Sequence, residues 1–143
     1  MTYRLLEKFD DKDIPSILSA YMQPTISQFI GIDNENYWIY ITSTDGVYFY
    51  KVYKDDILVG TMHLELSDGI LYMSVVVLPE YQRQGYATTM IKDIQAGKFG
   101  LDFNKIEVSI NEKNIASIRL FNSVGFVCTG KDGELFEYEY SKG

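Results

Sequence analysis

The segment from Val75 to Ala87 constrains the fold of this chain more than any other part of the sequence. An apolar run, Val75-Val76-Val77-Leu78, ends at Pro79, a short polar loop follows, and Gly85 precedes an amphipathic stretch. This pattern predicts a buried strand, a turn and a helix. The first turn of a helix presents unpaired backbone N–H groups at the positive end of the helix dipole. The loop is therefore either a phosphate site or a turn that needs glycine only for its geometry.

The spacing of residues in this loop separates it from the two best-known phosphate-binding patterns. It is neither G-x-x-x-x-G-K-[ST] nor G-x-G-x-x-G. Gln82-x-x-Gly85-x-Ala87 resembles the [RQ]-x-x-G-x-[GA] pyrophosphate loop of the GNAT superfamily of acyl-CoA N-acyltransferases, and it follows Val-x-Pro as in that family. The resemblance implies that acetyl-CoA is the cosubstrate and that its pyrophosphate is bound by Gln82, Arg83, Gln84, Gly85, Tyr86 and Ala87.

A second segment, Asn114 to Phe126, resembles the late N-x-x-[AS]-I-x-L-Y-x-x-x-G-F element of the same superfamily. Asn114 is a good helix N-cap, and Gly125 suits the position just after a helix end. The two elements occur in the family's order, and the likeness extends over roughly residues 58–127. The chain is identified as a member of this superfamily. The resemblance also implies a cofactor-binding and catalytic role for Asn114.

Length and composition predict one domain covering residues 1–143. The chain has 143 residues, of which 46% are hydrophobic, enough for a full-sized core. Its start mixes charges with apolar residues, which fits neither a signal peptide nor a membrane span. A lone cysteine, Cys128, cannot form an internal disulfide, so we expect a cytoplasmic protein. We also expect a monomer or homodimer without a metal site.

The net charge of −7 bears on the choice of partner. It argues against nucleic acid, because phosphate backbones are bound by basic surfaces. It favours a cationic acceptor, such as a small amine or a peptide amine, through long-range attraction. The same acidity can serve solubility alone.

Strand and helix signals alternate along the whole chain. Their order is that of the GNAT fold: an α/β single domain whose mixed, mostly antiparallel sheet is flanked by helices, with a splayed strand pair at the CoA site. We expect strands at 3–8, 47–53, 57–66, 70–78, 105–110, 126–129 and 134–140, and helices from Asp11 or Asp13 to about 21, at 25–30, at 84–98 and from Asn114.

The chemistry implied by the resemblance is direct attack of an amine on the thioester of acetyl-CoA. Pantetheine would pair with the strand edge at Val75 and Val77, and backbone N–H groups of Val76 and Val77 would stabilise the oxyanion. The same run also fits an ordinary central strand. Phe121 occupies the position where the family usually carries a tyrosine that protonates the CoA thiolate. The resemblance implies that Phe121 binds the cofactor and faces the CoA sulfur, and burial in the core is the alternative. Either Asn111 or Ser117 acts through a water, or the thiolate leaves unassisted, which slows catalysis by ~10²–10⁴-fold without preventing it.

Neither the resemblance nor the residues assign the general base to a single side chain. Leu71 lies where some family members carry glutamate, so Glu65 and Glu107 are the leading candidates on neighbouring strands. His63 shares a strand face with Glu65, and histidine titrates nearest to neutral pH. Cys128 is expected to be a buried filler rather than an acylated nucleophile.

Three aromatic residues, Tyr37, Trp38 and Tyr40, precede the first hairpin. They can either pack in the core or hold an ammonium group by cation–π attraction.

The expected activity is acetyl transfer to a primary amine of a small molecule or peptide. The alternative is a catalytically weak or inactive acyl-CoA-binding or interaction module, which Phe121 supports. Acceptors carried on tRNA are disfavoured by the acidity.

Overall fold

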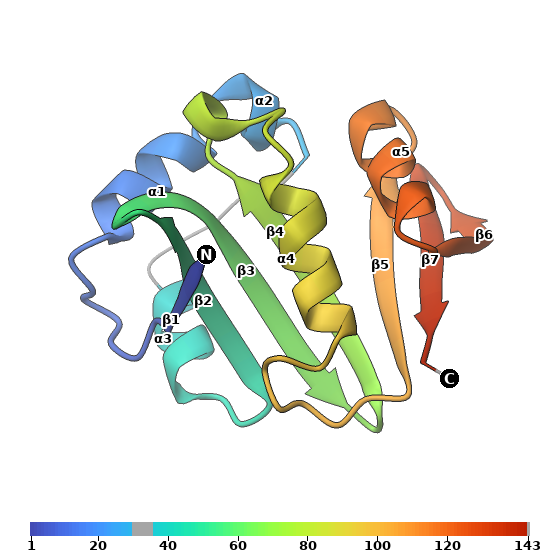
Figure 1. Ribbon diagram of the computed structural model, residues 1–143, viewed down its shortest axis with the longest axis horizontal. Helices are drawn as coiled ribbons and strands as arrows, with labels where there is room; N and C mark the ends of the chain where they lie inside the picture. Colours follow the sequence, from blue (N-terminus) through green and yellow to red (C-terminus); the bar gives the residue numbers. More distant parts are fainter. Residues whose placement is uncertain (30–35, 143) are drawn as a thin grey trace.

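A mixed seven-stranded sheet forms the frame of the protein in the computed structural model, which describes residues 1–29 and 36–142 (Figure 1). The strand order is β1-β2-β3-β4-β5-β7-β6. Neighbouring strands are antiparallel except for the parallel pair β4–β5. The strands are β1 (Thr2–Leu5), β2 (Val47–Lys54), β3 (Ile57–Ser67), β4 (Ile70–Val77), β5 (Lys105–Asn111), β6 (Val127–Asp132) and β7 (Leu135–Ser141).

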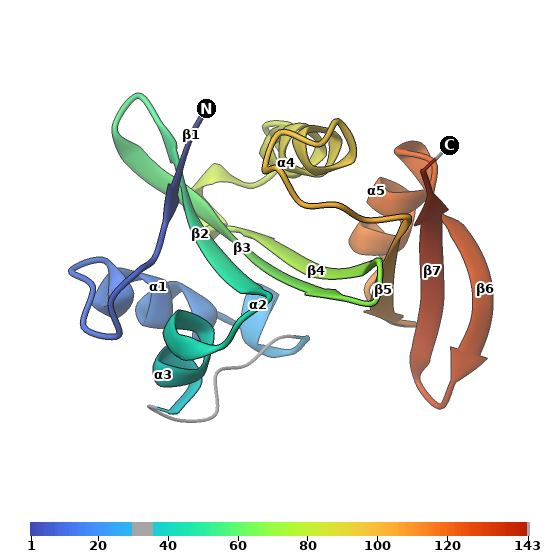
Figure 2. The same cartoon turned by 90° about the horizontal axis from the view of Figure 1, so that it is seen from below.

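Helices cover both faces of the sheet (Figure 2). On one face lie α1 (Ile14–Tyr21), α2 (Pro24–Ser27) and α3 (Asn36–Ser43), and on the other lies α4 (Tyr86–Gln95). The helix α5 (Ile115–Ser123) shares the hydrophobic core of α4. A second, smaller core joins α1, α2 and α3 to the opposite sheet face.

Side chains of β4 alternate between these two cores. Leu71 and Met73 are buried beneath α4, and Val75 and Val77 pack against the same core. Val76 is buried with the residues of α1, α2 and α3. This alternation follows from the period of two in a strand and makes β4 the boundary between the two layers.

Most of the predicted elements are confirmed, with altered bounds. The first strand ends at Leu5, because Leu6 turns into the core with 1% of its surface exposed. The helix after the loop ends at Gln95 rather than at Lys98, because Gly97 takes a left-handed conformation with φ 76°. Pro24 begins α2 as well as ending α1, and α2 stops at Ser27; position 30 of the expected helix lies outside the described residues.

The helix α3 was not predicted. Its sequence, Asn-Tyr-Trp-Ile-Tyr-Ile-Thr-Ser, is rich in aromatic and β-branched residues that favour strands. Trp38 and Ile41, three residues apart, are both buried against Phe49 and its neighbours on β2. Burial of this helical face outweighs the weak local preference of these residues.

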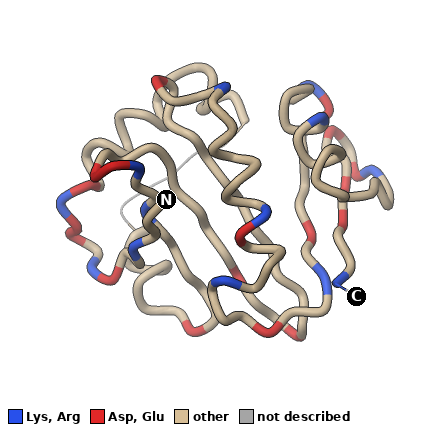
Figure 3. The backbone as a smooth tube through the Cα atoms, in the orientation of Figure 1, with Lys and Arg blue, Asp and Glu red and all other residues tan. Residues whose placement is uncertain are grey.

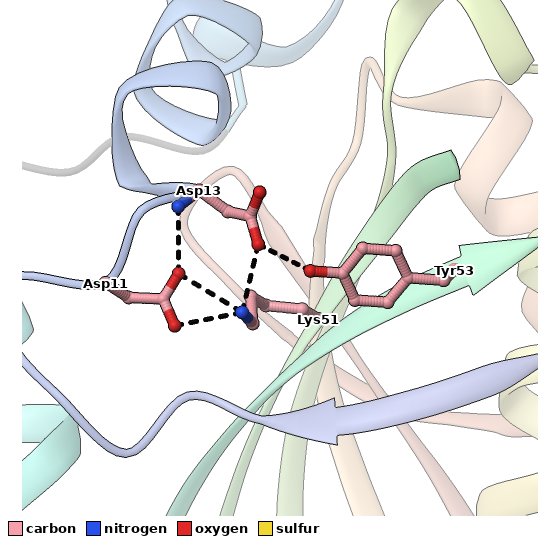
Figure 4. Close-up of polar contacts among 4 residues, drawn as sticks. All are labelled: Asp11, Asp13, Lys51 and Tyr53. Carbon is pink, nitrogen blue, oxygen red and sulfur yellow. Dashed lines mark hydrogen bonds and ion pairs between the residues drawn. The ribbon is translucent and has the colours of Figure 1, made fainter. Parts of the chain in front are cut away.

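Asp13 occupies the N-cap position of α1, as expected, but its side chain does not cap the helix. Its carboxylate instead accepts hydrogen bonds from Lys51 Nζ, at 2.9 Å, and from the Tyr53 hydroxyl (Figure 4). Lys51 also contacts both carboxylate oxygens of Asp11, at 2.9 and 3.1 Å. This cluster attaches the start of α1 to β2, and the buried lysine is fully compensated by two carboxylates.

Candidate active site

The loop between β4 and α4 contains two residues in left-handed backbone conformations. A short 3₁₀ turn, Pro79–Tyr81, follows β4, and Arg83 and Gly85 then adopt left-handed conformations with φ 65° and 83°. Gly85 is the N-cap residue of α4 and has no capping side chain. Apart from Gly85 itself and its two chain neighbours, no described residue has an atom within 4 Å of the position that a β-carbon of Gly85 would take. There is therefore open space beside the residue that precedes the first N–H groups of α4.

The strands β4 and β5 separate next to this loop, as predicted. They pair only at Ile70–Lys105, Leu71–Ile106 and Tyr72–Glu107, and from Met73 onward β4 has no pairing with β5 (Figure 1). The edge of β4 that faces β5 is therefore available over Met73–Val77.

Strand alternation decides which amides lie on this edge. Leu78 N–H donates to the carbonyl of Val59 on β3, at 2.8 Å. Backbone polar groups alternate along an antiparallel strand, so those of Val76 also point to β3 and those of Val75 and Val77 point to the open edge. Gln82 Nε2 donates to the carbonyl of Val77, at 3.1 Å, which agrees with this direction. Alternation thus favours Val75 and Val77 over Val76 as donors to a ligand, and the donor role itself stays a prediction.

The predicted residues on α5 lie across the separation from β4. Asn114 caps α5 through a hydrogen bond from Ser117 N–H to its Oδ1, at 3.3 Å, as predicted. Asn111 Oδ1 accepts from Lys113 N–H, at 2.9 Å. Phe121 is 6% exposed and packs edge-to-face on Phe126, with ring centroids 4.9 Å apart. This burial favours a core role for Phe121, and its contact with the cofactor stays a prediction.

On the sheet face covered by α1 and α3, every second position of β3 carries a polar side chain, namely Thr61, His63 and Glu65. Each of them forms a hydrogen bond with a tyrosine of α1 or α3. We call this set the tyrosine ladder. Tyr21 of α1 bonds Thr61, at 2.8 Å; Tyr37 of α3 bonds His63 Nδ1, at 2.6 Å; and Tyr40 of α3 donates to Glu65 Oε1, at 3.0 Å. His63 Nε2 lies 2.8 Å from the same Oε1.

The hydroxyl groups of this ladder are held in their protonated form. Burial raises the pKa of Tyr21 to about 12. Burial also raises the pKa of Tyr37, with contributions from Tyr21, Glu65 and Tyr40. The hydrogen bond to Glu65 raises the pKa of Tyr40. The three phenols are therefore neutral at physiological pH.

The ladder was missed because α3 was not predicted. The period of two in Thr61-x-His63-x-Glu65, within an otherwise apolar strand, was the available signal. Glu65 and Glu107 lie in one row across the sheet, since Tyr72 of β4 pairs with both. The side chain of Glu107 contacts Lys105, at 3.1 Å, so its charge is compensated. Cys128 is exposed on β6, which corrects the prediction of a buried filler.

The sequence pattern of the Acetyltransferase (GNAT) family matches residues 14–126, more than half of the chain. The chain belongs to the GNAT acetyltransferase family. No curated protein is significantly similar to it in sequence. The matched range contains the loop, the β4 edge, the tyrosine ladder and α5, so the site described here coincides with the part that carries the GNAT pattern.

Solved GNAT structures have the same fold. The spermidine N-acetyltransferase from Vibrio cholerae, in complex with CoA and spermine, has a TM-score of 0.81 at 18% identity, covering 99% of this chain and 95% of that chain. The N-acetyltransferase PseH of Campylobacter jejuni gives 0.79 at 10% identity, over 99% and 98%. The PaiA N-acetyltransferase of Thermoplasma acidophilum, in complex with coenzyme A, gives 0.75 at 14%, over 99% of each chain.

Within residues 1–29 and 36–142, no three His, Cys, Asp or Glu side chains are grouped so that they could hold a metal ion. None of the helices in these ranges is both long and apolar enough to span a bilayer.

Proposed function

We propose that this protein is an N-acetyltransferase that transfers the acetyl group of acetyl-CoA to a primary amine by direct attack, and that residues 1–143 act as one catalytic domain. The observation that carries the proposal is the combination of an open β4 edge with the turn at Gly85. The edge offers amides to pantetheine, and the turn offers helix N–H groups to the pyrophosphate. The CoA complexes of the two structural relatives support this choice of cosubstrate.

The position of the loop sets the direction in which the cofactor would cross the sheet. The loop leads into α4, which covers one face, whereas α1, α2 and α3 cover the other (Figure 2). A cofactor with its pyrophosphate at Gly85 and its pantetheine beside Val75 and Val77 would carry its thioester toward the second face. The amine would then approach from the side of the tyrosine ladder. The amide of Val75 or Val77 would stabilise the oxyanion.

The acceptor is proposed to be a cationic amine of a small molecule or a peptide. Glu65 lies on the acceptor side of the sheet, and the whole chain, whose charged residues are coloured in Figure 3, carries a net charge of −7. Both features attract a protonated amine. Polyamines are reasonable first candidates, because one structural relative is a spermidine N-acetyltransferase with bound spermine.

A second candidate function, acyl-CoA binding with weak or no catalysis, rests on Phe121. The family usually has a tyrosine at this position, and a phenyl ring cannot donate a proton to the CoA thiolate. An unassisted thiolate remains a tolerable leaving group, because a thiol has a pKa near ~8.5. We therefore place catalysis ahead of binding alone.

The test is to incubate the protein with acetyl-CoA and a panel of polyamines, amino acids, aminoglycosides and peptides. Free thiol and acetylated product are measured together, the second by mass spectrometry. We expect both, in equal amounts, for at least one amine. Binding of acetyl-CoA without product for any amine would favour the second candidate, and no binding would reject both.

A further inference from the structure

We infer that Tyr37, His63 and Glu65 form a relay that removes the proton from the acceptor amine and holds it on His63. The inference rests on the proposed function, since it concerns the same reaction. An amine reaches the enzyme mainly as the ammonium ion, which has no lone pair for attack. A group that accepts its proton is therefore needed on the side from which the amine approaches.

The hydrogen bonds fix the protonation pattern of the relay. An ionised carboxylate only accepts hydrogen bonds, so the proton between His63 and Glu65 lies on Nε2 of His63. In a neutral imidazole, Nδ1 is then the acceptor, and the Tyr37 hydroxyl donates to it. Tyr40 donates to the same oxygen of Glu65 and holds the carboxylate in place. His63 therefore has one basic nitrogen, and that nitrogen is reached through Tyr37.

The ladder is within reach of the reacting atoms. His63 pairs with Ser74 of β4, and paired residues present their side chains on the same face. Ser74 is the second residue after the last β4–β5 pair, so it lies at the beginning of the open edge. A pantetheine on that edge would lie about two strand spacings from β3, roughly 10 Å. This distance fits an amine, one bridging water and the Tyr37 hydroxyl in sequence.

The proton balance closes without a further reactant. An N–H bond of the ammonium ion breaks, and the proton passes through water to the Tyr37 oxygen as the Tyr37 proton moves to Nδ1 of His63. The neutral amine then attacks the thioester carbonyl, the C–N bond forms, and the C–S bond breaks with its electron pair on sulfur. The second amine proton goes to the thiolate or to solvent. The His63 imidazolium lies beside the Glu65 carboxylate and returns its proton to solvent after product release.

The groups around His63 come from its own strand and from α1, α3, β2 and β4. On α3, Tyr37 bonds His63 directly and Tyr40 bonds its partner Glu65, which lies on the same strand as His63. On α1, Tyr21 bonds Thr61, the preceding polar residue on this face of β3. The phenols are neutral, as described above. The ring packs on Phe49 of β2 at a centroid distance of 6.3 Å, and its β4 neighbours are Ser74 and, beside Glu65, Tyr72. Lys51, two residues beyond Phe49 on β2, is paired with the carboxylates of Asp11 and Asp13.

The first arm of the test does not need a substrate. His63 is the only histidine of the chain, so its ring gives an isolated set of NMR signals. Nitrogen-15 shifts are recorded across pH 4 to 9 for the wild type, Glu65→Gln and Tyr37→Phe. We expect the neutral ring to carry its proton on Nε2 in the wild type. The Nδ1 signal should change in Tyr37→Phe and the Nε2 signal in Glu65→Gln, because each substitution alters the hydrogen-bond partner of that nitrogen. A proton on Nδ1 of the neutral ring, or a ring spectrum that neither substitution changes, would overturn the relay.

The second arm uses an amine that the wild type acetylates. In His63→Gln and Tyr37→Phe we expect kcat to fall roughly 100-fold, with the KM for acetyl-CoA unchanged. Without the relay only the neutral form of the amine in solution can react, so the kcat/KM of both variants should rise tenfold per pH unit up to the pKa of the amine. The kcat/KM of the wild type should level off at a lower pH. The control is Tyr3→Phe, which likewise removes a phenol hydroxyl, here one that donates to Asp93 on the α4 side of the sheet, and it should leave kcat and its pH profile unchanged.

The outcomes separate this inference from the proposed function. If the wild type is active and His63→Gln keeps more than half of kcat with an unchanged pH profile, the relay is wrong and the N-acetyltransferase proposal stands. If the wild type acetylates no amine of the panel, the proposed function fails and the relay fails with it.

Discussion

Two glycines at the ends of α4 allow the role of the loop to be separated from the stability of the helix. Gly85 and Gly97 have φ values of 83° and 76°, and among the described residues nothing lies within 4 Å of a β-carbon built on either. Alanine in this conformation costs roughly 1–2 kcal/mol. Gly85→Ala and Gly97→Ala should therefore lower the free energy of unfolding equally, with a fall in Tm of roughly 2–4 °C per kcal/mol.

Only the first substitution should affect the cofactor. The methyl group of Gly85→Ala would occupy the open space beside the main chain that a bound pyrophosphate needs, so CoA affinity should fall at least ~10-fold, or about 1.4 kcal/mol. Gly97→Ala, at the far end of the helix, should bind CoA as the wild type does. Urea unfolding measures the first quantity and isothermal titration with CoA the second. Equal CoA affinity in the two variants would refute the backbone cradle, and an equally large loss in Arg83→Ala would indicate a side-chain clamp.

Three further substitutions or modifications test the fold and the site. Lys51→Met leaves two nearly buried carboxylates without their cation and should cost about 3 kcal/mol at pH 7 in urea unfolding. Burial alone would raise the pKa of Asp13, but its hydrogen bonds to Tyr53 and Lys51 lower it. This stabilisation is therefore present above about pH 4 and lost as pH falls further. A difference in the free energy of unfolding between the wild type and Lys51→Met that is as large at pH 2 as at pH 7 would contradict the assignment. Phe121→Tyr should lower stability by about 1–3 kcal/mol with unchanged acetyl-CoA affinity, because the hydroxyl enters a core position; higher turnover at unchanged Tm would instead place the ring at the cofactor. Alkylation of Cys128 with a maleimide should go to completion in the folded protein without loss of activity, and inactivation would revive the acyl-enzyme route.

The sequence predicts local features well where one residue type has one physical role. Asn114 caps α5 and Gly125 takes the left-handed conformation after it, with φ 93°, as their types require. The two hairpin turns at Asp55-Asp56 and Asp68-Gly69 have the positive φ values that such turns need. The separation of β4 from β5 followed from the resemblance alone, because nothing in the composition of either strand ends the pairing after Tyr72.

Prediction fails where tertiary contacts decide. The segment of α3 has strand-forming residues, and only the burial of Trp38 and Ile41 makes it helical. Without that helix, Tyr37 and Tyr40 could not be placed over His63 and Glu65. The motif position of Phe121 likewise does not decide whether a ring without a hydroxyl group turns toward the ligand or into the core, because the packing around the ring decides it.

Amide hydrogen exchange, measured by NMR with and without acetyl-CoA, tests the central claim most directly. The claim is that the edge of β4 and the first turn of α4 are the acetyl-CoA site. In the free protein the amide of Val76 should already be protected by β3, while those of Val75 and Val77 exchange fast. Saturating acetyl-CoA should slow exchange at Val75, Val77, Tyr86 and Ala87 and leave Val76 unchanged. Unchanged exchange at all of these amides in the presence of acetyl-CoA would contradict the claim.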